Sequence, residues 1–372
     1  MRVNHQTVAL ITGASGGLGR ATARLLADRG ASLILLARGQ EGLEGAKREV
    51  EARGGRALVV PTDVSRFEEV QAAADIGERE FGPIDLWINN AMVSMYSPFM
   101  RMTPEEFRRI VEVTFLGSVH GTRCALERML PRDRGVIIQV GSALAFRSIP
   151  LQSAYCASKH ALQGFIESIW TELLHEKSRV QVSMVNMPAL NTTQFIWTRN
   201  NLPRRMKPVG PIYQPEVGAR AILFAAEHRR REWMVGYSTV EATVGEKFIP
   251  RILDRYLAHQ AWEGSMSTER ADPQAPSNLW EPIARDLGAH GPFDQLAHEH
   301  SPQQWLNENR ARLAQLLVPA VLLLAGWIRR RRHHRGPRYP ADGNRSLLPR
   351  RSASSFSDRC GRRAWRAWHA ST

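Results

Sequence analysis

Residues 7–19 read TVALITGASGGLG, an apolar run that leads directly into a cluster of glycines. Apolar residues then recur at helical spacing, so the sequence predicts a strand over Thr7–Ile11, a tight turn, and a helix over Gly19–Arg29. Phosphate groups bind well at such a turn, because free backbone N–H groups and the positive end of the helix dipole face it. The alternative is a glycine turn that binds no ligand.

Short apolar runs and helical segments keep alternating as far as residue 240. Strands are predicted over Ser32–Ala37, Arg56–Pro61, Ile84–Asn89, Gly135–Val140, Val180–Met187 and Trp233–Tyr237. Helices are predicted over Gln40–Arg53, Ser65–Phe81, a long segment opened by Thr103, Ala154–Glu176, Pro215–Glu227 and Phe248–Trp262. This alternation predicts an α/β fold, a doubly wound parallel sheet of the Rossmann type with helices on both faces.

The positive charge of the chain is concentrated at its C-terminal end. Of the net charge of +14, +11 lies beyond residue 328, where 13 arginines face only Asp342 and Asp358. The remaining body carries +3, so the sequence does not predict a nucleic acid as its partner.

The cysteines and histidines do not form a recognisable framework. Cys124, Cys156 and Cys360 are widely spaced and odd in number, which fits neither a disulfide set nor a zinc site. His290, His298 and His300 lack the spacing of metal ligands, so no metal site is expected. The chain enters its first strand without the apolar region of a secretory signal, and we expect a cytoplasmic protein.

A second informative stretch, SALAFRSIPLQSAYCASK, covers Ser142–Lys159. The sequence predicts a strand ending at Val140, a loop carrying Ser142, and a helix on which Tyr155 and Lys159 lie one turn apart. A phenol with a pKa near ~10 is a poor acid–base catalyst at neutral pH, but a neighbouring ammonium group lowers that pKa. This trio suits hydride transfer at a carbonyl or alcohol, with Ser142 binding the substrate oxygen.

Together these motifs resemble the short-chain dehydrogenase/reductase family over roughly residues 5 to 240. The glycines follow that family's Gly-x-x-x-Gly-x-Gly spacing, whereas most dinucleotide-binding folds use Gly-x-Gly-x-x-Gly. The resemblance rests on Thr12–Gly19, Asp63-Val64, Asn89-Asn90-Ala91, Ser142, Tyr155, Lys159, and Pro188 with Thr192.

The resemblance implies an enzyme that uses a nicotinamide cofactor, acts on a small-molecule carbonyl or alcohol, and assembles as a homodimer or homotetramer. Tyr155 would donate the proton, and Lys159 would hold the nicotinamide ribose. Thr192 would hold the carboxamide, and Asp63 would bond the adenine unless it merely caps a helix. The implied cofactor-binding residues are Gly13, Ser15, Gly17, Leu18, Gly19, Asp63, Val64, Asn90, Tyr155, Lys159 and Thr192.

The chain departs from the family's pattern at three positions. Thr114 stands where most members have an asparagine that supports a proton relay, which puts the turnover rate in doubt. We count Thr114 among the candidate catalytic residues for that reason. Met92 and Ala189 replace glycines of two further motifs.

Arg38 follows the second predicted strand, at the position that selects the cofactor. NAD-specific sites usually place an acidic group there to bind the ribose 2′-OH, whereas a basic group accommodates a 2′-phosphate. The guanidinium of Arg38 can bind phosphate with two parallel hydrogen bonds. The sequence therefore favours NADP(H) as the cofactor, the alternative being that Arg38 is an ordinary solvated residue.

Residues 190–213 carry many apolar side chains among prolines and are expected to form a lid over an apolar pocket, although some of these side chains could instead pack the core or a subunit interface. We expect a catalytic domain over residues 1–262 and a polar extension over 263–312. An apolar segment over 313–328 and a disordered basic tail over 329–372 would follow.

The apolar segment 313–328 is short for a membrane span, and Pro319 weakens it as a helix. We expect it to lie in the interface of an anionic membrane on the cytoplasmic face, with Arg329–Arg332 meeting the headgroups. The alternatives are a true transmembrane span and packing of the segment on a neighbouring subunit.

Two other classes of function fit parts of the pattern. A sugar-nucleotide epimerase or dehydratase shares Tyr-x-x-x-Lys and a Rossmann sheet, but the glycine spacing argues against it. A non-catalytic NADP(H)-binding sensor or scaffold would explain Thr114 and Ala189, although Ser142, Tyr155 and Lys159 are intact.

Overall fold

The computed structural model describes residues 1–372 except residues 273, 311 and 314 and the ranges 316–326 and 328–372. The chain divides into a compact unit over Met1–Leu313 and a second unit over Ala314–Thr372. Almost all of the predicted apolar segment 313–328, and all of the basic tail, lie outside the described residues. Among the described residues, no helix combines the length and apolar character that crossing a bilayer requires.

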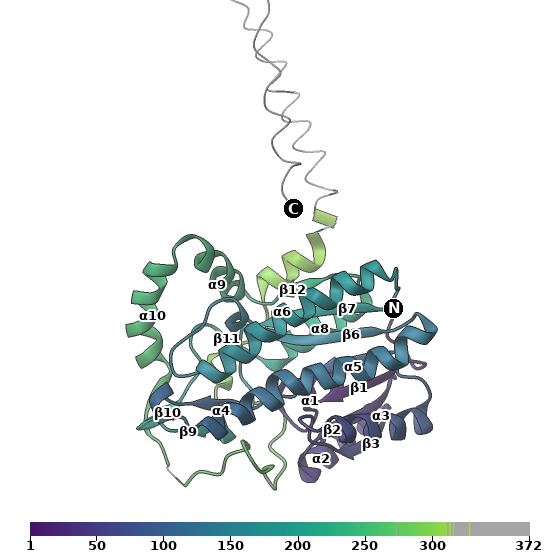
Figure 1. The fold of residues 1–372 in the computed structure, drawn as a ribbon, viewed down its shortest axis with the longest axis horizontal. Helices are drawn as coiled ribbons and strands as arrows, with labels where there is room; N and C mark the ends of the chain where they lie inside the picture. Colours follow the sequence, from purple (N-terminus) through teal and green to yellow (C-terminus); the bar gives the residue numbers. More distant parts are fainter. Residues whose placement is uncertain (273, 311, 314, 316–326, 328–372) are drawn as a thin grey trace, which may run out of the picture. The chain divides into compact units, whose positions relative to one another are not determined.

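A seven-stranded sheet in the order β12-β7-β6-β4-β1-β2-β3 forms the centre of the compact unit (Figure 1). Every pairing within it is parallel. Alternate residues of β1 supply opposite cores, with Ala9 and Ile11 on one side and Val8 and Leu10 on the other. The strands are β1 (Val8–Thr12), β2 (Ser32–Ala37), β3 (Arg56–Pro61), β4 (Leu86–Asn89), β6 (Val136–Ser142), β7 (Gln181–Met187) and β12 (Glu232–Met234).

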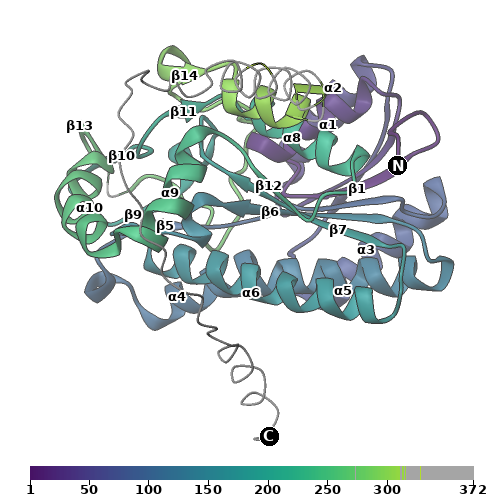
Figure 2. The ribbon, with the colours of Figure 1, turned by 90° about the horizontal axis from the view of Figure 1, so that it is seen from above.

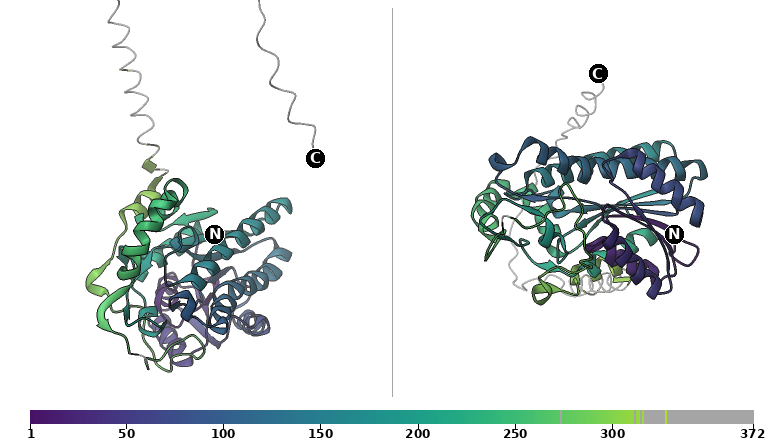
Figure 3. Two further views of the ribbon diagram at one scale, coloured as in Figure 1. Left: turned by 60° about the vertical axis from the view of Figure 1, so that its left-hand side comes forward. Right: turned by 90° about the horizontal axis from the view of Figure 1, so that it is seen from below.

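Helices cover both faces of this sheet, as Figures 2 and 3 show. One layer holds α1 (Gly17–Ala27), α2 (Gln40–Ala52) and α8 (Pro215–Glu227). The opposite layer holds α3 (Phe67–Phe81), α4 (Pro104–Val111), α5 (Gly117–Met129) and α6 (Ser153–His175). The doubly wound α/β fold is thereby confirmed. Because β1 lies between β2 and β4, the strand order reverses there, and ligands of such sheets bind beyond the carboxyl ends at that point.

The structure corrects several predicted boundaries. β6 runs to Ser142 and does not end at Val140, because Ser142 still pairs with Met187 of β7. The strand expected to reach Tyr237 ends earlier, since Gly236 turns the chain with a φ of 76°. The helix expected over Phe248–Trp262 is confirmed, with each bound two residues later than predicted.

The expected helix is α10 (Pro250–Gly264), and a further helix, α9 (Tyr237–Phe248), precedes it without having been predicted. The chain breaks between them at Ile249, whose φ and ψ are −136° and 45°. Pro250 then begins α10, where its missing N–H costs nothing.

Small sheets tie residues 190–213 and the later extension to this body. β5 (Met95–Tyr96) pairs with β9 (Arg199–Asn200), and β10 (Arg204–Met206) pairs with β13 (Met266–Arg270). β11 (Ile212–Tyr213) lies between β8 (Ala189–Leu190) and β14 (Ala297–His298). The compact unit therefore continues past residue 262, and the described part of 263–312 packs on the catalytic body. Further elements are α7 (Gln194–Trp197), 3-10 turns at Phe99–Arg101, Leu130–Arg132, Ala143–Ala145 and Asp294–Leu296, and a π-helix at Glu112–Leu116, and residues 302–310 are helical.

Candidate active site

A cavity of about 980 Å³ lies at the carboxyl ends of the central strands. It is lined by the glycine-rich turn after β1, by the ends of β2, β6 and β7, by α6, by the segment 188–197, and by α9 and α10. This volume is at the upper end of the range for ligand pockets. The cavity brings most of the predicted site residues to one place.

The glycine-rich turn forms one end of the cavity. Gly13, Ser15, Gly17 and Leu18 line it, whereas Gly19 does not. Gly13 has a φ of 68°, and a Cβ there would lie 2.8 Å from the Cα of Ala91. Gly19 instead permits close packing, since its added Cβ would collide with the carbonyl of Gly13. α1 begins here without a side-chain cap, and the amide of its first residue, Gly17, donates to the carbonyl of Gly288 at 3.2 Å. The next amides of the first turn have no intrahelical partner and can bind a ligand.

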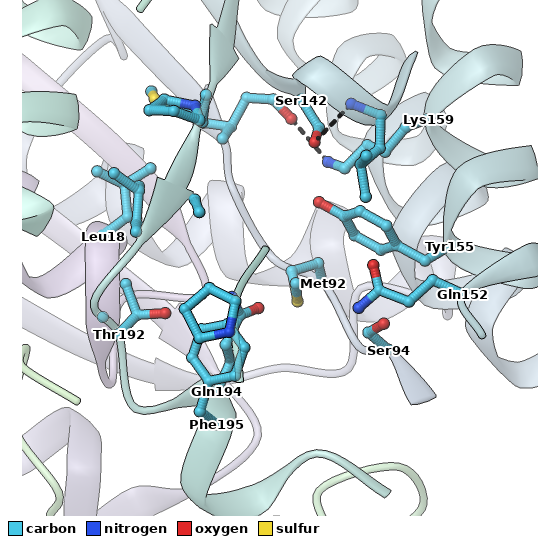
Figure 4. Close-up of a pocket in the computed structure, with 18 of the residues that line it drawn as sticks. Leu18, Met92, Ser94, Ser142, Gln152, Tyr155, Lys159, Thr192, Gln194 and Phe195 are labelled. Atoms are coloured by element: carbon cyan, nitrogen blue, oxygen red, sulfur yellow. Dashed lines mark hydrogen bonds between the residues drawn. The ribbon is translucent and has the colours of Figure 1, made fainter. Parts of the chain in front are cut away.

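Ser142, Tyr155 and Lys159 lie together on another side of the cavity, across from Leu18 and Thr192 (Figure 4). Ser142 is the last residue of β6, and its Oγ accepts a hydrogen bond from the Leu144 amide at 3.1 Å. Tyr155 and Lys159 follow on the first turns of α6. The convergence predicted from their spacing is present.

The amine of Lys159 is held in place by the backbone of β6. Its Nζ donates to the carbonyl of Val140 at 2.7 Å and lies 5.6 Å from the centre of the Tyr155 ring. Because the side chain is only 3% exposed, burial lowers the pKa of Lys159 to about 8. The amine is thus rigidly placed beside the phenol.

Burial raises the pKa of Tyr155 to about 12, and its hydrogen bond with Ser142 offsets only part of this rise. The phenol therefore keeps its proton at neutral pH. Burial is the largest influence on the pKa of Tyr155 in this structure. A protonated phenol is suited to act as a proton donor.

Arg38 follows β2 directly, is half-buried and lies beside the cavity. Its guanidinium donates to the carbonyl of Trp280 at 2.6 Å and to the carbonyl of Asn278. Burial and the nearby charge of Arg109 lower the pKa of Arg38. Arg38 is therefore not an ordinary solvated loop residue.

Asp63 and Val64 line the cavity beyond β3. The carboxylate of Asp63 accepts from Arg109 at 2.6 Å and from the amide of Ser65 at 3.0 Å. These bonds lower the pKa of Asp63 against the opposing effect of burial. Asp63 does not cap α3, whose N-cap position is Arg66.

Two further predicted residues, Asn90 and Thr192, line the cavity. Asn90 lines the cavity and donates to the carbonyls of Thr12 and Gly13 at 3.0 and 3.2 Å, so it holds the glycine-rich turn in shape. Thr192 lines the cavity and is 7% exposed.

Thr114 is not part of the cavity lining. It lies in the π-helix, fully buried, where its hydroxyl donates to the carbonyl of Val93 at 2.8 Å and accepts from the Val93 amide at 3.1 Å. Its side chain therefore secures the segment after β4. A role of Thr114 in a proton relay stays a prediction.

The sequence did not nominate several residues that line the cavity. Gln152 is 6% exposed and lies beside Tyr155 (Figure 4), yet no motif marks it. Asn278, Pro282, Ile283, Arg285 and Leu287 line the cavity from the extension. The aromatic and proline residues of the stretch 278–282 were the available signal, since they stand out in an otherwise polar region.

Comparisons with known proteins agree with this geometry. A family model described as short chain dehydrogenase matches residues 7–201. The uncharacterized oxidoreductase YxnA of Bacillus subtilis is 34% identical over 276 residues, which cover 74% of this chain and 78% of that protein.

Solved structures give the same result. The crystal structure of a metagenomic short-chain oxidoreductase in complex with NADP aligns with a TM-score of 0.54 and 28% identity, over 63% of this chain and 98% of that one. A short chain dehydrogenase/reductase from Burkholderia phymatum in complex with NAD aligns with a TM-score of 0.59 over 69% of this chain and 96% of that one. The 24% identity of the latter supports a likeness of fold alone.

Proposed function

This chain belongs to the short-chain dehydrogenase family and is an oxidoreductase of that type, and from this premise we propose that it is an NADP(H)-dependent enzyme acting on a carbonyl or secondary alcohol of an apolar small molecule. The observation that carries the proposal is the convergence of Ser142, Tyr155 and Lys159 on a cavity that also contains the glycine-rich turn. A nicotinamide cofactor bound there would supply the hydride.

The side chains can perform the proton chemistry of carbonyl reduction. Tyr155 holds its proton at neutral pH, because its pKa is raised to about 12, and donates it to the carbonyl oxygen as that oxygen gains charge. The Ser142 hydroxyl orients the same oxygen. Lys159, fixed on the carbonyl of Val140, stabilises the phenolate that remains whenever its amine is charged.

The glycine-rich turn and the residues around it supply the cofactor site. Gly13, Ser15, Gly17, Leu18, Asp63, Val64, Asn90 and Thr192 line the cavity and are the proposed cofactor contacts. The choice of NADP(H) rests on Arg38, which places a guanidinium beside the cavity where NAD-specific sites usually carry a carboxylate. Arg38 uses only part of its hydrogen-bonding capacity on Asn278 and Trp280, and further N–H groups remain for a phosphate.

The wall near Tyr155 supports an apolar substrate. Apolar side chains from α9 and α10 face the cavity there, among them Val240, Val244, Leu253 and Leu257. Such a wall would bind the hydrocarbon part of a substrate and keep water from the reacting carbon.

A single-turnover experiment tests the function. NADPH-loaded protein mixed with a panel of aliphatic, aromatic and steroid-sized carbonyls should lose absorbance at the nicotinamide band with at least one apolar member. Reaction with sugar nucleotides alone would favour the epimerase class. Failure of every carbonyl, and of every alcohol with NADP⁺, despite tight cofactor binding, would favour the sensor.

The context of the enzyme is a separate part of the proposal. The uncharged run 313–328, followed by Arg329–Arg332, supports attachment to the cytoplasmic face of an anionic membrane. In cell fractionation, the protein is expected to pellet with membranes and to be released from them by high salt. Recovery of the protein in a fraction free of membranes would refute the attachment. The family resemblance supports a homodimer or homotetramer, which light scattering of the eluted protein checks.

A further inference from the structure

Residues 278–293, here called the strap, lie outside the stretch 7–201 that matches the family model. They follow the polar segment after β13 and run along the edge of the compact unit toward α2, visible in Figure 1 as the green loop at the lower edge of the ribbon. Asn278, Pro282, Ile283, Arg285 and Leu287 line the cavity. The strap therefore forms a wall of the same space as the glycine-rich turn.

The first part of the strap is bound at the ends of β2 and β3. The carbonyl of Leu279 accepts from Arg109 at 3.1 Å, and those of Asn278 and Trp280 accept from Arg38. Leu279 itself is fully buried in the core cluster on the α3 side of the sheet. This part of the strap is fastened by both polar and apolar contacts.

The middle of the strap is bound to α1 and α2. Asp286 forms an ion pair with Arg20, whose side chain is 4% exposed and also pairs with Glu49 at 2.9 Å. Glycine at position 45 of α2 leaves room for this carboxylate, since a Cβ there would collide with it. The carbonyl of the next glycine, Gly288, accepts from the Gly17 amide at 3.2 Å.

The last part of the strap reaches the opposite side of the cleft, beside the residue proposed to hold the nicotinamide. His290 pairs with Thr192 in an antiparallel bridge, and Gly291 donates to the carbonyl of Asn191 at 3.2 Å. His290 also lies 2.9 Å from the carboxylate of Glu216 on α8. The strap thus crosses the mouth of the cleft from the end of β3 to the segment after β7.

The strap covers the cleft and does not fill it. A space of about 980 Å³ persists beneath it, and the strap supplies part of the lining. Arg285 of the strap is exposed and lines the cavity, and Arg38, just after β2, lines it as well. Arginine side chains at the edge of this cavity suit the anionic phosphate groups of a dinucleotide.

We propose that residues 278–293 form the outer wall of the cofactor site and enclose the adenosine half of the dinucleotide, so that the cofactor is exchanged only when the strap detaches. This inference rests on the proposed function, because it requires a dinucleotide in the cleft. The Arg20–Asp286 ion pair is its most specific fastening, since neither residue belongs to the cavity lining.

The first test measures the release of NADPH by stopped-flow fluorescence, chasing the loaded protein with excess NADP⁺. Asp286→Ala should release NADPH at least roughly tenfold faster than the wild type. Glu299→Ala is the matched control, because it removes an exposed carboxylate of the same extension whose side chain has no described partner. Equal release rates for Asp286→Ala and the wild type would overturn the proposal.

The second test locks the strap without removing a fastening. A Cβ on Gly39 would lie 3.3 Å from the Cβ of Pro282, near the ~3.8 Å typical of a disulfide. A Gly39→Cys/Pro282→Cys protein, with Cys360→Ser, should retain preloaded NADPH when oxidised and release it after reduction. Oxidised protein made empty should take up NADPH at least roughly tenfold more slowly than reduced protein.

Two results would contradict the enclosure. Preloaded, oxidised protein that releases NADPH as fast as reduced protein would show that the strap does not control exchange. A disulfide that forms only in the empty protein would show that the strap occupies the site. A wild type that binds neither NADPH nor NADH would refute the proposed function itself, which separates the two failures.

Discussion

The two walls of the cavity are built in different ways. The catalytic wall comes from neighbouring stretches of sequence: Ser142 ends β6, and Tyr155 and Lys159 follow on α6. The outer wall comes from residues far along the chain, and its fastenings join positions such as Arg20 and Asp286, which are 266 residues apart. Local geometry therefore specifies the catalytic wall, whereas long-range polar pairing specifies the outer one.

This difference separates the consequences of mutation. A change at Tyr155 is expected to alter the chemistry and to leave cofactor binding nearly intact, because we propose that its phenol contacts the reacting oxygen. A change in the outer wall alters how firmly the cofactor is held, because its side chains fasten one part of the chain to another. Both walls contain buried charged side chains. The stability of each wall should therefore depend on pH and on the partners of those charges.

The largest expected effect lies in the catalytic wall. Tyr155→Phe removes the only proton that the phenol can give, and turnover should fall by roughly 10²–10⁴-fold, the range for general acid catalysis. Steady-state kinetics measures this loss, and fluorescence titration should show nearly unchanged NADPH binding. Wild-type turnover in this variant would refute the assignment of Tyr155.

A second change in the same wall tests its buried charge. Burial lowers the pKa of Lys159 to about 8, whereas an unfolded chain titrates lysine near ~10.4. The unfolded state thus binds more protons between these values, and this lysine makes the free energy of unfolding rise with pH there. Lys159→Met removes that dependence.

The stability advantage of Lys159→Met over the wild type should be greatest below pH 8, up to about 3 kcal/mol, and should shrink toward pH ~10. Chemical denaturation across this range measures the difference. The lost hydrogen bond to the carbonyl of Val140 adds a constant offset, so the slope is the test. A flat difference would show that Lys159 is charged in the folded protein throughout.

Arg38 links the cofactor site to the outer wall, because it follows β2 and holds the carbonyls of Asn278 and Trp280. Arg38→Ala should weaken NADPH binding by about 1.5–3 kcal/mol through the lost phosphate contact. It should also weaken NADH binding slightly, because the strap is loosened. Titrating the Asp286→Ala protein with both cofactors measures the loss of affinity that comes from the loosened strap alone. If Arg38→Ala lost the same affinity for NADPH and for NADH, selection of NADP(H) by this residue would be refuted.

The smallest expected effect concerns Thr114, which stands behind the catalytic wall. Thr114→Val leaves the amide and carbonyl of Val93 without their partner and should lower the free energy of unfolding by about 1–3 kcal/mol. Thr114→Ser keeps the hydroxyl and is the control. Turnover of the folded Thr114→Val protein should be close to that of the wild type. A large loss of turnover without a loss of stability would instead support a catalytic role for Thr114.

The sequence predicted the parts whose signal is local. The strand–turn–helix at the glycine-rich turn, the alternation that gives the sheet, and the spacing of Tyr155 and Lys159 all depend on neighbours along the chain. The hydrogen bonds of Thr114 were not predicted, because their partner, Val93, is 21 residues away and the π-helix around Thr114 has no clear sequence signal. The strap was missed because its carbonyls carry no residue type that a motif could record.

The helix α9 was missed because of its composition. Its segment carries Thr239, Val240, Thr243, Val244 and Gly245, which have low intrinsic helix propensity. The start of α10, by contrast, was predicted to within two residues.

The contact between Gly45 and Asp286 has a consequence for the ancestry of this protein. A side chain at position 45 would meet the carboxylate of Asp286, so a larger residue there would require the Asp286 side chain to shift. Relatives whose chains end before residue 278 are free to carry any helix-forming residue at position 45, where glycine is unfavourable. Those that retain an acidic residue at position 286 should keep glycine at position 45, and this pairing would mark the lineage in which the extension was acquired.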